Sequence, residues 1–148
     1  MMRANYQQIA AAGMKALGGV YGYVRDCGLP KQLVDLVYLR ASQINGCAYC
    51  MASHTTDLID TGVPVRKLML VSAWQETGDM FSERERAALA WTEEVTLVAE
   101  THVADEAFTA VRAHFSEKEV ADLTIAISLI NSYNRIAISF RRGPEPST

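Results

Sequence analysis

Two cysteines and a histidine carry the clearest chemical signal in the chain: Cys47, Cys50 and His54 follow one another at steps of three and four residues. Residues at these spacings share one face of a helix. Asn45-Gly46 interrupts a helical pattern just before them, so we expect a new helix to begin at Cys47. The first turn of a helix carries unpaired N–H groups and the positive end of the helix dipole, which favour a thiolate. The thiolate is the form of cysteine that attacks a peroxide or a disulfide.

The Cys-x-x-Cys spacing predicts a redox cycle. One thiolate attacks its substrate to give a sulfenic acid or a mixed disulfide, and the neighbouring thiol then closes an internal disulfide. Two unrelated buried cysteines are one alternative, and a metal site is another. Cys47, Cys50 and His54 offer three ligands, whereas a structural zinc site needs four, and neither His102 nor His114 has ligand-like spacing. We therefore expect no metal and no bound cofactor.

His54 lies one turn after Cys50, where a neutral imidazole can take the thiol proton and an imidazolium can hold the thiolate. Asp35 is the candidate that orients it. If the helices on either side of Asn45-Gly46 pack antiparallel, Asp35 and His54 lie nearly level, about 3 Å apart in height. A carboxylate there can hold the imidazole in one tautomer, as in a catalytic triad. A solvated carboxylate with no catalytic role is the alternative for Asp35.

Length and composition are consistent with one globular domain. The chain has 148 residues, of which 49% are hydrophobic, enough to form a core. The formal net charge is -3 and no basic patch is present, which argues against a nucleic-acid partner. Three cysteines, two of them close together, are not a secreted disulfide framework.

Neither a secretory signal nor a membrane span is predicted. Residues 1–8 lack the apolar run of a signal peptide. The most apolar segment, residues 120–140, contains charged and amide side chains that argue against a membrane helix: Asp122, Asn131, Asn134 and Arg135. We therefore expect a cytoplasmic protein without a membrane or nucleic-acid partner.

The hydrophobic periodicity is helical almost throughout, so the predicted fold class is all-α. Helices are expected over residues 31–45 after Pro30, over 47–60, over 65–74, from the capping box Ser82-x-x-Glu85, from a cap at Asp105, and over 117–141 from the capping box Ser116-x-x-Glu119. Glycines at 18, 19 and 22 predict a bend or a short helical turn over residues 18–30. One domain is expected over residues 1–142, with a disordered tail over 143–148.

The segment Leu39-Arg-Ala-Ser-Gln-Ile-Asn-Gly-Cys-Ala-Tyr-Cys-Met-Ala-Ser-His54 resembles the signature of the alkylhydroperoxidase AhpD-like proteins of the carboxymuconolactone decarboxylase superfamily. Residues 81–91, 114–124 and 130–135 agree with the same family, so the resemblance spans about residues 25 to 140. It implies an all-helical bundle in which an antiparallel helix pair carries the Cys-x-x-Cys. It also implies a homo-oligomer, from a dimer or trimer to a hexamer.

The resemblance implies a thiol-dependent peroxidase that reduces alkyl hydroperoxides with a dithiol reductant or a redox partner protein. A thiol–disulfide oxidoreductase that reduces disulfides with the same dithiol belongs to the same hypothesis. The catalytic residues would be Cys50 as the peroxidatic thiol, Cys47 as the resolving thiol, His54 and Asp35. The family has a glutamate where this chain has Asp35, which is one methylene shorter. Helix-terminus electrostatics favour Cys47 as the reactive thiol, whereas the family pattern and His54 favour Cys50, which we adopt.

Two other functions remain open from the sequence. One is a carboxymuconolactone decarboxylase-like lyase, against which the intact Cys-x-x-Cys argues because acid–base decarboxylation needs no dithiol. The other is a non-enzymatic redox sensor that uses the same disulfide. The sequence does not name the peroxide, the reductant or the size of the oligomer.

Overall fold

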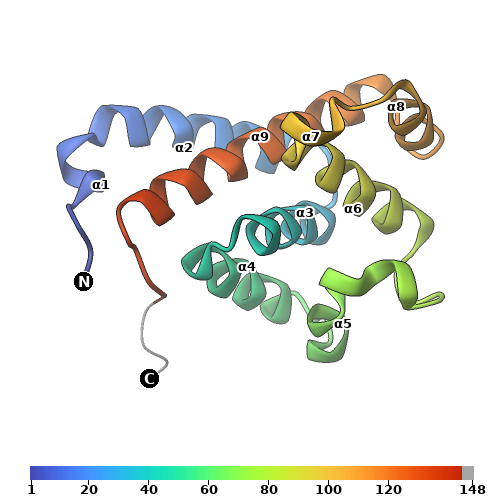
Figure 1. Cartoon of the computed structure of the whole chain (residues 1–148), viewed down its shortest axis with the longest axis horizontal. Coiled ribbons are helices and arrows are strands. Elements are labelled where there is room, and N and C mark those ends of the chain that lie inside the picture. Colours follow the sequence, from blue (N-terminus) through green and yellow to red (C-terminus); the bar gives the residue numbers. More distant parts are fainter. Residues whose placement is uncertain (145–148) are drawn as a thin grey trace.

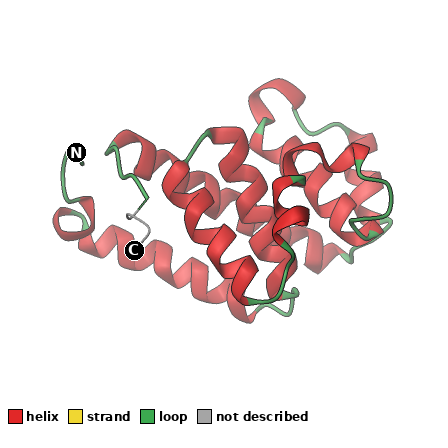
Figure 2. Cartoon of the chain, turned by 90° about the horizontal axis from the view of Figure 1, so that it is seen from below, coloured by secondary structure: helices red, strands yellow, loops and turns green. Residues whose placement is uncertain are grey.

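The computed structural model describes residues 1–144, in which helices joined by loops and turns are the secondary structure and no strand occurs (Figures 1 and 2). The prediction of an all-α fold is thereby confirmed. In chain order the helices are α1 (Tyr6–Ile9), α2 (Ala11–Asp26), α3 (Lys31–Asn45), α4 (Ala48–Asp60), α5 (Val65–Met69), the 3-10 helix η1 (Val71–Glu76), α6 (Glu83–Thr96), α7 (Val98–Thr101), α8 (Asp105–Arg112) and α9 (Glu117–Ser139). Among these described residues, no helix is both long enough and apolar enough to cross a membrane.

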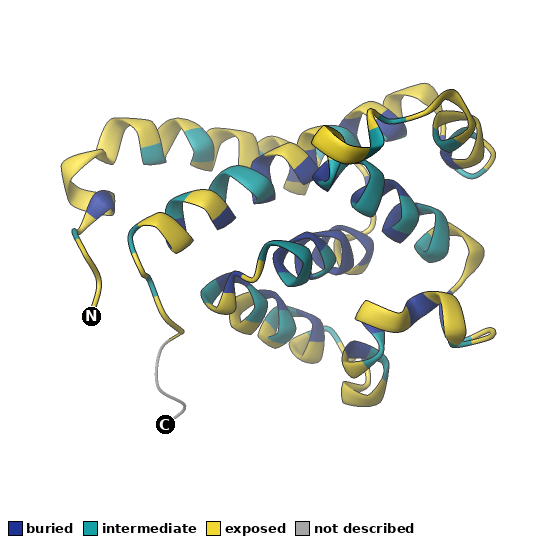
Figure 3. Cartoon of the chain, viewed as in Figure 1, coloured by how far each residue is buried: buried dark blue, intermediate teal, exposed yellow. Residues whose placement is uncertain are grey.

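Helix α3 lies at the centre of the bundle and packs against α4, α6 and α9 (Figures 1 and 3). It separates two hydrophobic clusters. Val37 and Ala41 on one face join α9 and α6, and Leu36 and Leu39 on another face join α4, α5 and η1. All four side chains are at most 2% exposed. A helix that is apolar on several faces is held in place from all sides, so α3 is a rigid support for any polar group it carries.

Helices α3 and α4 form the predicted antiparallel pair. Gly46 ends α3 in the left-handed conformation with a φ of 72°, which a side chain at Cβ would strain. At the far end of the pair, the Gln32 Nε2 near the start of α3 donates a hydrogen bond to the Thr61 carbonyl oxygen at the end of α4. The tight turn puts Cys47 at the N-cap of α4, one residue before the helix begins.

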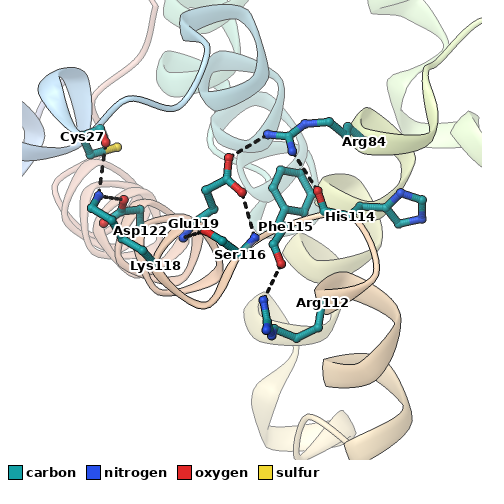
Figure 4. A network of polar contacts seen from close by, with 9 residues as sticks. All are labelled: Cys27, Arg84, Arg112, His114, Phe115, Ser116, Lys118, Glu119 and Asp122. Atoms are coloured by element: carbon teal, nitrogen blue, oxygen red, sulfur yellow. Dashed lines mark hydrogen bonds and ion pairs between the residues drawn. The ribbon is translucent and has the colours of Figure 1, made fainter.

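Polar contacts fix the start of α9 against α6 (Figure 4). The Ser116 hydroxyl and the Glu119 carboxylate form the predicted capping box. The Arg84 guanidinium donates to the His114 carbonyl oxygen at 2.8 Å and to the Glu119 carboxylate at 3.0 Å, and it lies over the Phe115 ring. The capping box predicted at Ser82 and Glu85 is also present, at the start of α6.

One turn into α9, a buried carboxylate is paired on both of its oxygens, and Figure 4 shows its contact with Lys118. Asp122 is 2% exposed; it accepts from the Lys118 ammonium at 2.5 Å and from the Tyr23 hydroxyl at 2.7 Å. Burial acts to raise the pKa of Asp122, but the hydrogen bonds from Lys118 and Tyr23 outweigh it and lower the pKa. Lys118 also donates to the carbonyl oxygen of Cys27, whose thiol is free and partly exposed.

Three local predictions were wrong. Helix α2 continues through Gly18, Gly19 and Gly22 to Asp26 despite the low helix propensity of glycine, and it packs against α9. The segment predicted as one helix over 65–74 is divided into α5 and η1 at Leu70, and the kink continues at Ala73, whose φ and ψ are not helical. Helix α8 begins at Asp105 without a side-chain cap, since Ala104 occupies the N-cap position.

The predicted tail over 143–148 falls mostly on residues 145–148, outside the described range.

Candidate active site

Cys47 and Cys50 are joined as a disulfide at the start of α4, with their Cα atoms 5.4 Å apart. The Cys47 sulfur also accepts a hydrogen bond from the Cys50 backbone N–H at 3.3 Å, so it caps the helix as a serine or threonine side chain would. Both side chains are buried, with exposed fractions of 1% and 4%. The turn after α3 therefore places two bonded sulfur atoms among buried side chains.

His54 lies one turn after Cys50 on α4 and is 9% exposed. Its Nδ1 atom faces two carboxylates, at 3.9 Å from Asp35 Oδ1 and 3.6 Å from Asp57 Oδ2. Both distances are too long for a hydrogen bond, and Nδ1 is buried without a hydrogen-bond partner among the described residues. Burial lowers the pKa of His54, and the two carboxylates oppose this shift without cancelling it. Burial therefore favours the neutral imidazole, the form that can accept a proton.

Asp35 reaches the site from α3 and is 3% exposed. Its Oδ2 atom accepts from the Lys31 ammonium at 2.6 Å, while its Oδ1 atom is the one that faces His54. Lys31 is four residues earlier on the same helix, and its own side chain is mostly exposed. The structure thus brings Asp35 beside His54 and gives it a positively charged neighbour on the other side.

Asp57 is a site residue that the sequence analysis missed. It lies three residues after His54 on α4, and its carboxylate is closer to Nδ1 than that of Asp35. The three-residue spacing of His54 and Asp57 indicates this proximity, because positions three apart share a helix face.

Asp35, His54 and Asp57 also form a set that could hold a metal ion. Their ligand atoms all lie within 4.8 Å of one another. The Lys31 ammonium already supplies positive charge to Asp35, so a cation bound here would have to compete with it.

A cavity of about 320 Å³ opens beside Cys50. Cys50, His54 and Asp57 line it together, whereas Cys47 is not among its lining residues. The opposite walls come from the two ends of the chain and from α2 and α9, through Tyr6, Gln7, Met14, Tyr21, Ile130, Tyr133, Ala137 and Arg142. The remaining lining residues are Tyr38, Tyr49 and Ser53. Only one sulfur of the pair therefore faces a space that a small molecule could occupy.

Asparagine side chains hold the turn that precedes the cysteines. The Asn45 amide donates to the Asn131 and Asn134 side-chain oxygens at 3.0 and 2.9 Å, and Asn134 donates to the Ser42 hydroxyl at 3.0 Å. Asn134 is fully buried, so these bonds satisfy an amide that would otherwise be costly to bury. The network ties the end of α3 to α9 and fixes where α4 and its sulfurs begin.

The fold and this site define a class. The model of the carboxymuconolactone decarboxylase family matches residues 9–94. A relative from Bacillus subtilis (strain 168), the uncharacterized protein YdfG, is 36% identical over 93% of this chain and 92% of its own length. The chain therefore belongs to the carboxymuconolactone decarboxylase family, within the AhpD-like group that the sequence resembles.

Two solved structures have a fold similar to that of this chain. A protein of unknown function from Agrobacterium tumefaciens, described as a candidate antioxidant defence protein AhpD, is 39% identical and superimposes with a TM-score of 0.95. The match covers 99% of this chain and 100% of that one. The debrominase Bmp8 is 25% identical with a TM-score of 0.78, over 88% of this chain and 69% of its own. The same scaffold thus occurs in proteins described with different activities.

Proposed function

We propose that this protein is a thiol-dependent peroxidase that reduces organic hydroperoxides through the Cys47–Cys50 pair. The observation that carries the proposal is that Cys50 and His54 line one cavity, while the disulfide partner Cys47 lies behind it. A substrate in the cavity can reach one sulfur and a proton acceptor together. Relatedness to a candidate antioxidant defence protein supports the same activity.

The proton path begins at the Cys50 thiol. His54 is one turn away, and its lowered pKa keeps the imidazole neutral and able to take the thiol proton. The imidazolium that forms then lies beside the Asp35 and Asp57 carboxylates, which stabilise its charge. Activation of the thiol therefore leaves a thiolate and an imidazolium held apart by one turn of helix.

Cys47 is the resolving thiol in this proposal. After Cys50 becomes a sulfenic acid, the Cys47 sulfur attacks it, water leaves, and the disulfide closes. A dithiol reductant or a redox partner protein then reopens the disulfide. The buried position of Cys47 and its absence from the cavity wall support the order in which Cys50 reacts first.

The opposite assignment has an argument of its own, since Cys47 occupies the N-cap and the Cys50 N–H points at its sulfur. That interaction stabilises a Cys47 thiolate and makes it a good leaving group when the reductant reopens the disulfide. It does not give Cys47 access to substrate. The N-cap effect and the cavity are thus compatible with distinct roles for the two cysteines.

Trapping the first oxidised sulfur tests the assignment. In Cys47→Ser, one equivalent of hydroperoxide should leave a sulfenic acid on Cys50, detected by dimedone labelling and mass spectrometry. Cys50→Ser should form none at Cys47 and should lose peroxide turnover with a dithiol reductant. Cys27→Ser is the matched control, because its thiol lies outside the site and its removal should leave turnover unchanged.

The outcomes separate the remaining functions. Oxidation of Cys47 alone would reverse the roles of the two sulfurs. Stoichiometric oxidation without turnover would favour a redox sensor. A lyase would retain its activity when both cysteines are replaced by serine.

We expect the enzyme to act in the cytoplasm as a homo-oligomer. The family resemblance supports assembly, and size-exclusion chromatography with light scattering measures it directly.

Reductive debromination is a second candidate, supported by the relative named as a debrominase. A dithiol can supply two electrons to a carbon–bromine bond: bromide leaves, the carbon takes one of the two thiol protons to form a carbon–hydrogen bond, and the two sulfurs close the same disulfide. Release of bromide from a bromopyrrole or bromophenol, with no reduction of hydroperoxides, would favour this activity over the first.

A further inference from the structure

Tyrosine is the most frequent residue type in the wall of the cavity beside Cys50. Five of the six tyrosines in the chain line it, and no phenylalanine or tryptophan does. They come from five different helices, α1, α2, α3, α4 and α9, as Tyr6, Tyr21, Tyr38, Tyr49 and Tyr133. Tyrosine offers a flat apolar ring together with a hydroxyl group. A wall of this composition suits a ligand that combines an aromatic ring with an oxygen-bearing polar group.

One of these hydroxyls lacks a partner. The Tyr38 side chain is 3% exposed, and its oxygen is buried with no hydrogen-bond partner among the described residues. The ring is held between Tyr21, with centroids 6.3 Å apart, and His54, with centroids 4.9 Å apart. A buried hydroxyl is costly unless it is hydrogen-bonded, so the arrangement favours a ligand that accepts from it. Burial also raises the pKa of Tyr38, which keeps the hydroxyl protonated and able to donate.

We propose that the cavity takes hydroperoxides that carry an aromatic ring, with the ring against the tyrosine faces and the Tyr38 hydroxyl donating a hydrogen bond to the oxygen that leaves. The inference rests on the proposed peroxidase function and names its substrate class and one further catalytic residue. The volume of about 320 Å³ is at the small end of the range of about 300–1,000 Å³ for ligand pockets, which suits a single ring with short substituents.

The chemical step balances with the groups present. The Cys50 thiolate attacks the outer oxygen of R–O–O–H, a sulfur–oxygen bond forms, and the oxygen–oxygen bond breaks. Sulfur is oxidised to the sulfenic acid, and the inner oxygen departs as R–O⁻. That oxygen takes the proton that His54 removed from the Cys50 thiol, so the products are Cys50–S–OH and R–OH. The Tyr38 hydrogen bond stabilises the negative charge on the inner oxygen while the bond breaks.

A pair of matched substrates measures the preference for a ring. Cumene hydroperoxide is tert-butyl hydroperoxide with one methyl group replaced by phenyl, so both present the same tertiary peroxide carbon. The wild-type enzyme should show a kcat/KM about tenfold higher for cumene hydroperoxide, from contact of the phenyl ring with the tyrosine faces. Tyr133→Leu should reduce that ratio severalfold, because kcat/KM should fall more for cumene hydroperoxide than for tert-butyl hydroperoxide.

Tyr38→Phe keeps the ring and removes only the hydroxyl. It should lower kcat/KM about ten- to a hundredfold for both hydroperoxides while retaining the ratio between them, because a hydrogen bond to developing charge is lost. The loss should shrink to about twofold with peracetic acid, whose leaving group is a carboxylate that needs little help. A purely structural role for Tyr38 would slow all three substrates alike. Tyr23→Phe is the matched control, since Tyr23 is the tyrosine outside the cavity, and it should leave every rate unchanged.

The outcomes separate failure of this inference from failure of the peroxidase proposal. If both hydroperoxides are reduced at equal rates, or Tyr38→Phe has no effect, the ring preference or the donor role is overturned and the peroxidase stands. If no hydroperoxide is reduced, the peroxidase proposal fails, and binding to the oxidised protein still tests the cavity. Titration with 2-phenylpropan-2-ol, followed by NMR, should shift the tyrosine ring signals, and tert-butanol at the same concentration should not. Equal or absent shifts from the two alcohols would overturn the assignment of an aromatic ligand.

Discussion

Two buried aspartates in this protein have the same local sequence arrangement but different surroundings. Asp122 on α9 and Asp35 on α3 each pair with a lysine four residues earlier, at 2.5 and 2.6 Å. The second oxygen of Asp122 accepts a hydrogen bond from the Tyr23 hydroxyl, whereas the second oxygen of Asp35 faces His54 Nδ1 across 3.9 Å without one.

The difference separates a structural carboxylate from one available for chemistry. Asp122 has hydrogen-bond partners on both oxygens and joins α2 to α9. Around Asp35, buried polar atoms lack hydrogen-bond partners within the described part of the chain, namely His54 Nδ1 and the Tyr38 hydroxyl. Native proteins leave few buried polar atoms unpaired, and such atoms gather where a substrate or a transferred proton will complete the bonding.

Removal of the imidazole beside Asp35 should have the largest effect on the reaction. His54→Ala should slow the reaction of Cys50 with hydroperoxide by about 10²- to 10⁴-fold, because the proton acceptor is lost. Stopped-flow measurement of sulfenic acid formation in the Cys47→Ser background checks it. His114→Ala is the control, since the His114 ring points away from its neighbours in Figure 4. Equal rates in His54→Ala and wild type would remove His54 from the mechanism.

Replacing the fully paired carboxylate should affect stability most. Asp122→Asn should lower the free energy of unfolding by about 2 kcal/mol, because the ionised acceptor of two hydrogen bonds is lost. Urea denaturation measures this change, and peroxide turnover of the folded variant should be unchanged. A loss of turnover with intact folding would show that Asp122 also serves the site.

Asp35→Asn should affect peroxide turnover more than it affects the free energy of unfolding. Its stability loss should be at most about 1 kcal/mol, since its ion pair involves a largely exposed lysine, as that of Asp122 does, but its second oxygen makes no hydrogen bond like the one from Tyr23 to Asp122. Turnover should fall about tenfold, because the imidazolium that forms on His54 loses a facing negative charge. The same two assays test both aspartate variants, and equal effects on stability would remove the distinction between them.

The smallest effect concerns the protonation of His54. Burial lowers its pKa from 6.5, and the two carboxylates oppose that shift, so Asp57→Asn should lower the pKa further. NMR titration of the imidazole in the oxidised protein measures it. Because the folded-state pKa lies below the unfolded value, the contribution of His54 to stability is complete above 6.5 and is lost as the pH falls through that value towards the folded pKa. A pKa at or above 6.5 in the wild type would contradict the role of burial.

Much of the fold was accessible from local patterns. The bounds of α3, the turn at Gly46 and both capping boxes follow from residues within a few positions of each other. The glycines of α2 show where this reasoning fails. Gly18, Gly19 and Gly22 favour a break by propensity alone, but α2 runs unbroken to Asp26 and lies against α9, about a hundred residues away in the sequence.

The candidate site likewise has some features that follow from local spacing and others that follow from tertiary packing. Helical spacing places two sulfurs and an imidazole on one helix face, and this follows from the sequence because such spacing is a local property of the chain. The packing of the helices determines which sulfur faces a cavity, that Asp57 approaches His54 more closely than Asp35, and that five tyrosines from five helices line the cavity beside Cys50. These relations depend on how helices distant in sequence pack, and no local pattern encodes the distance between them.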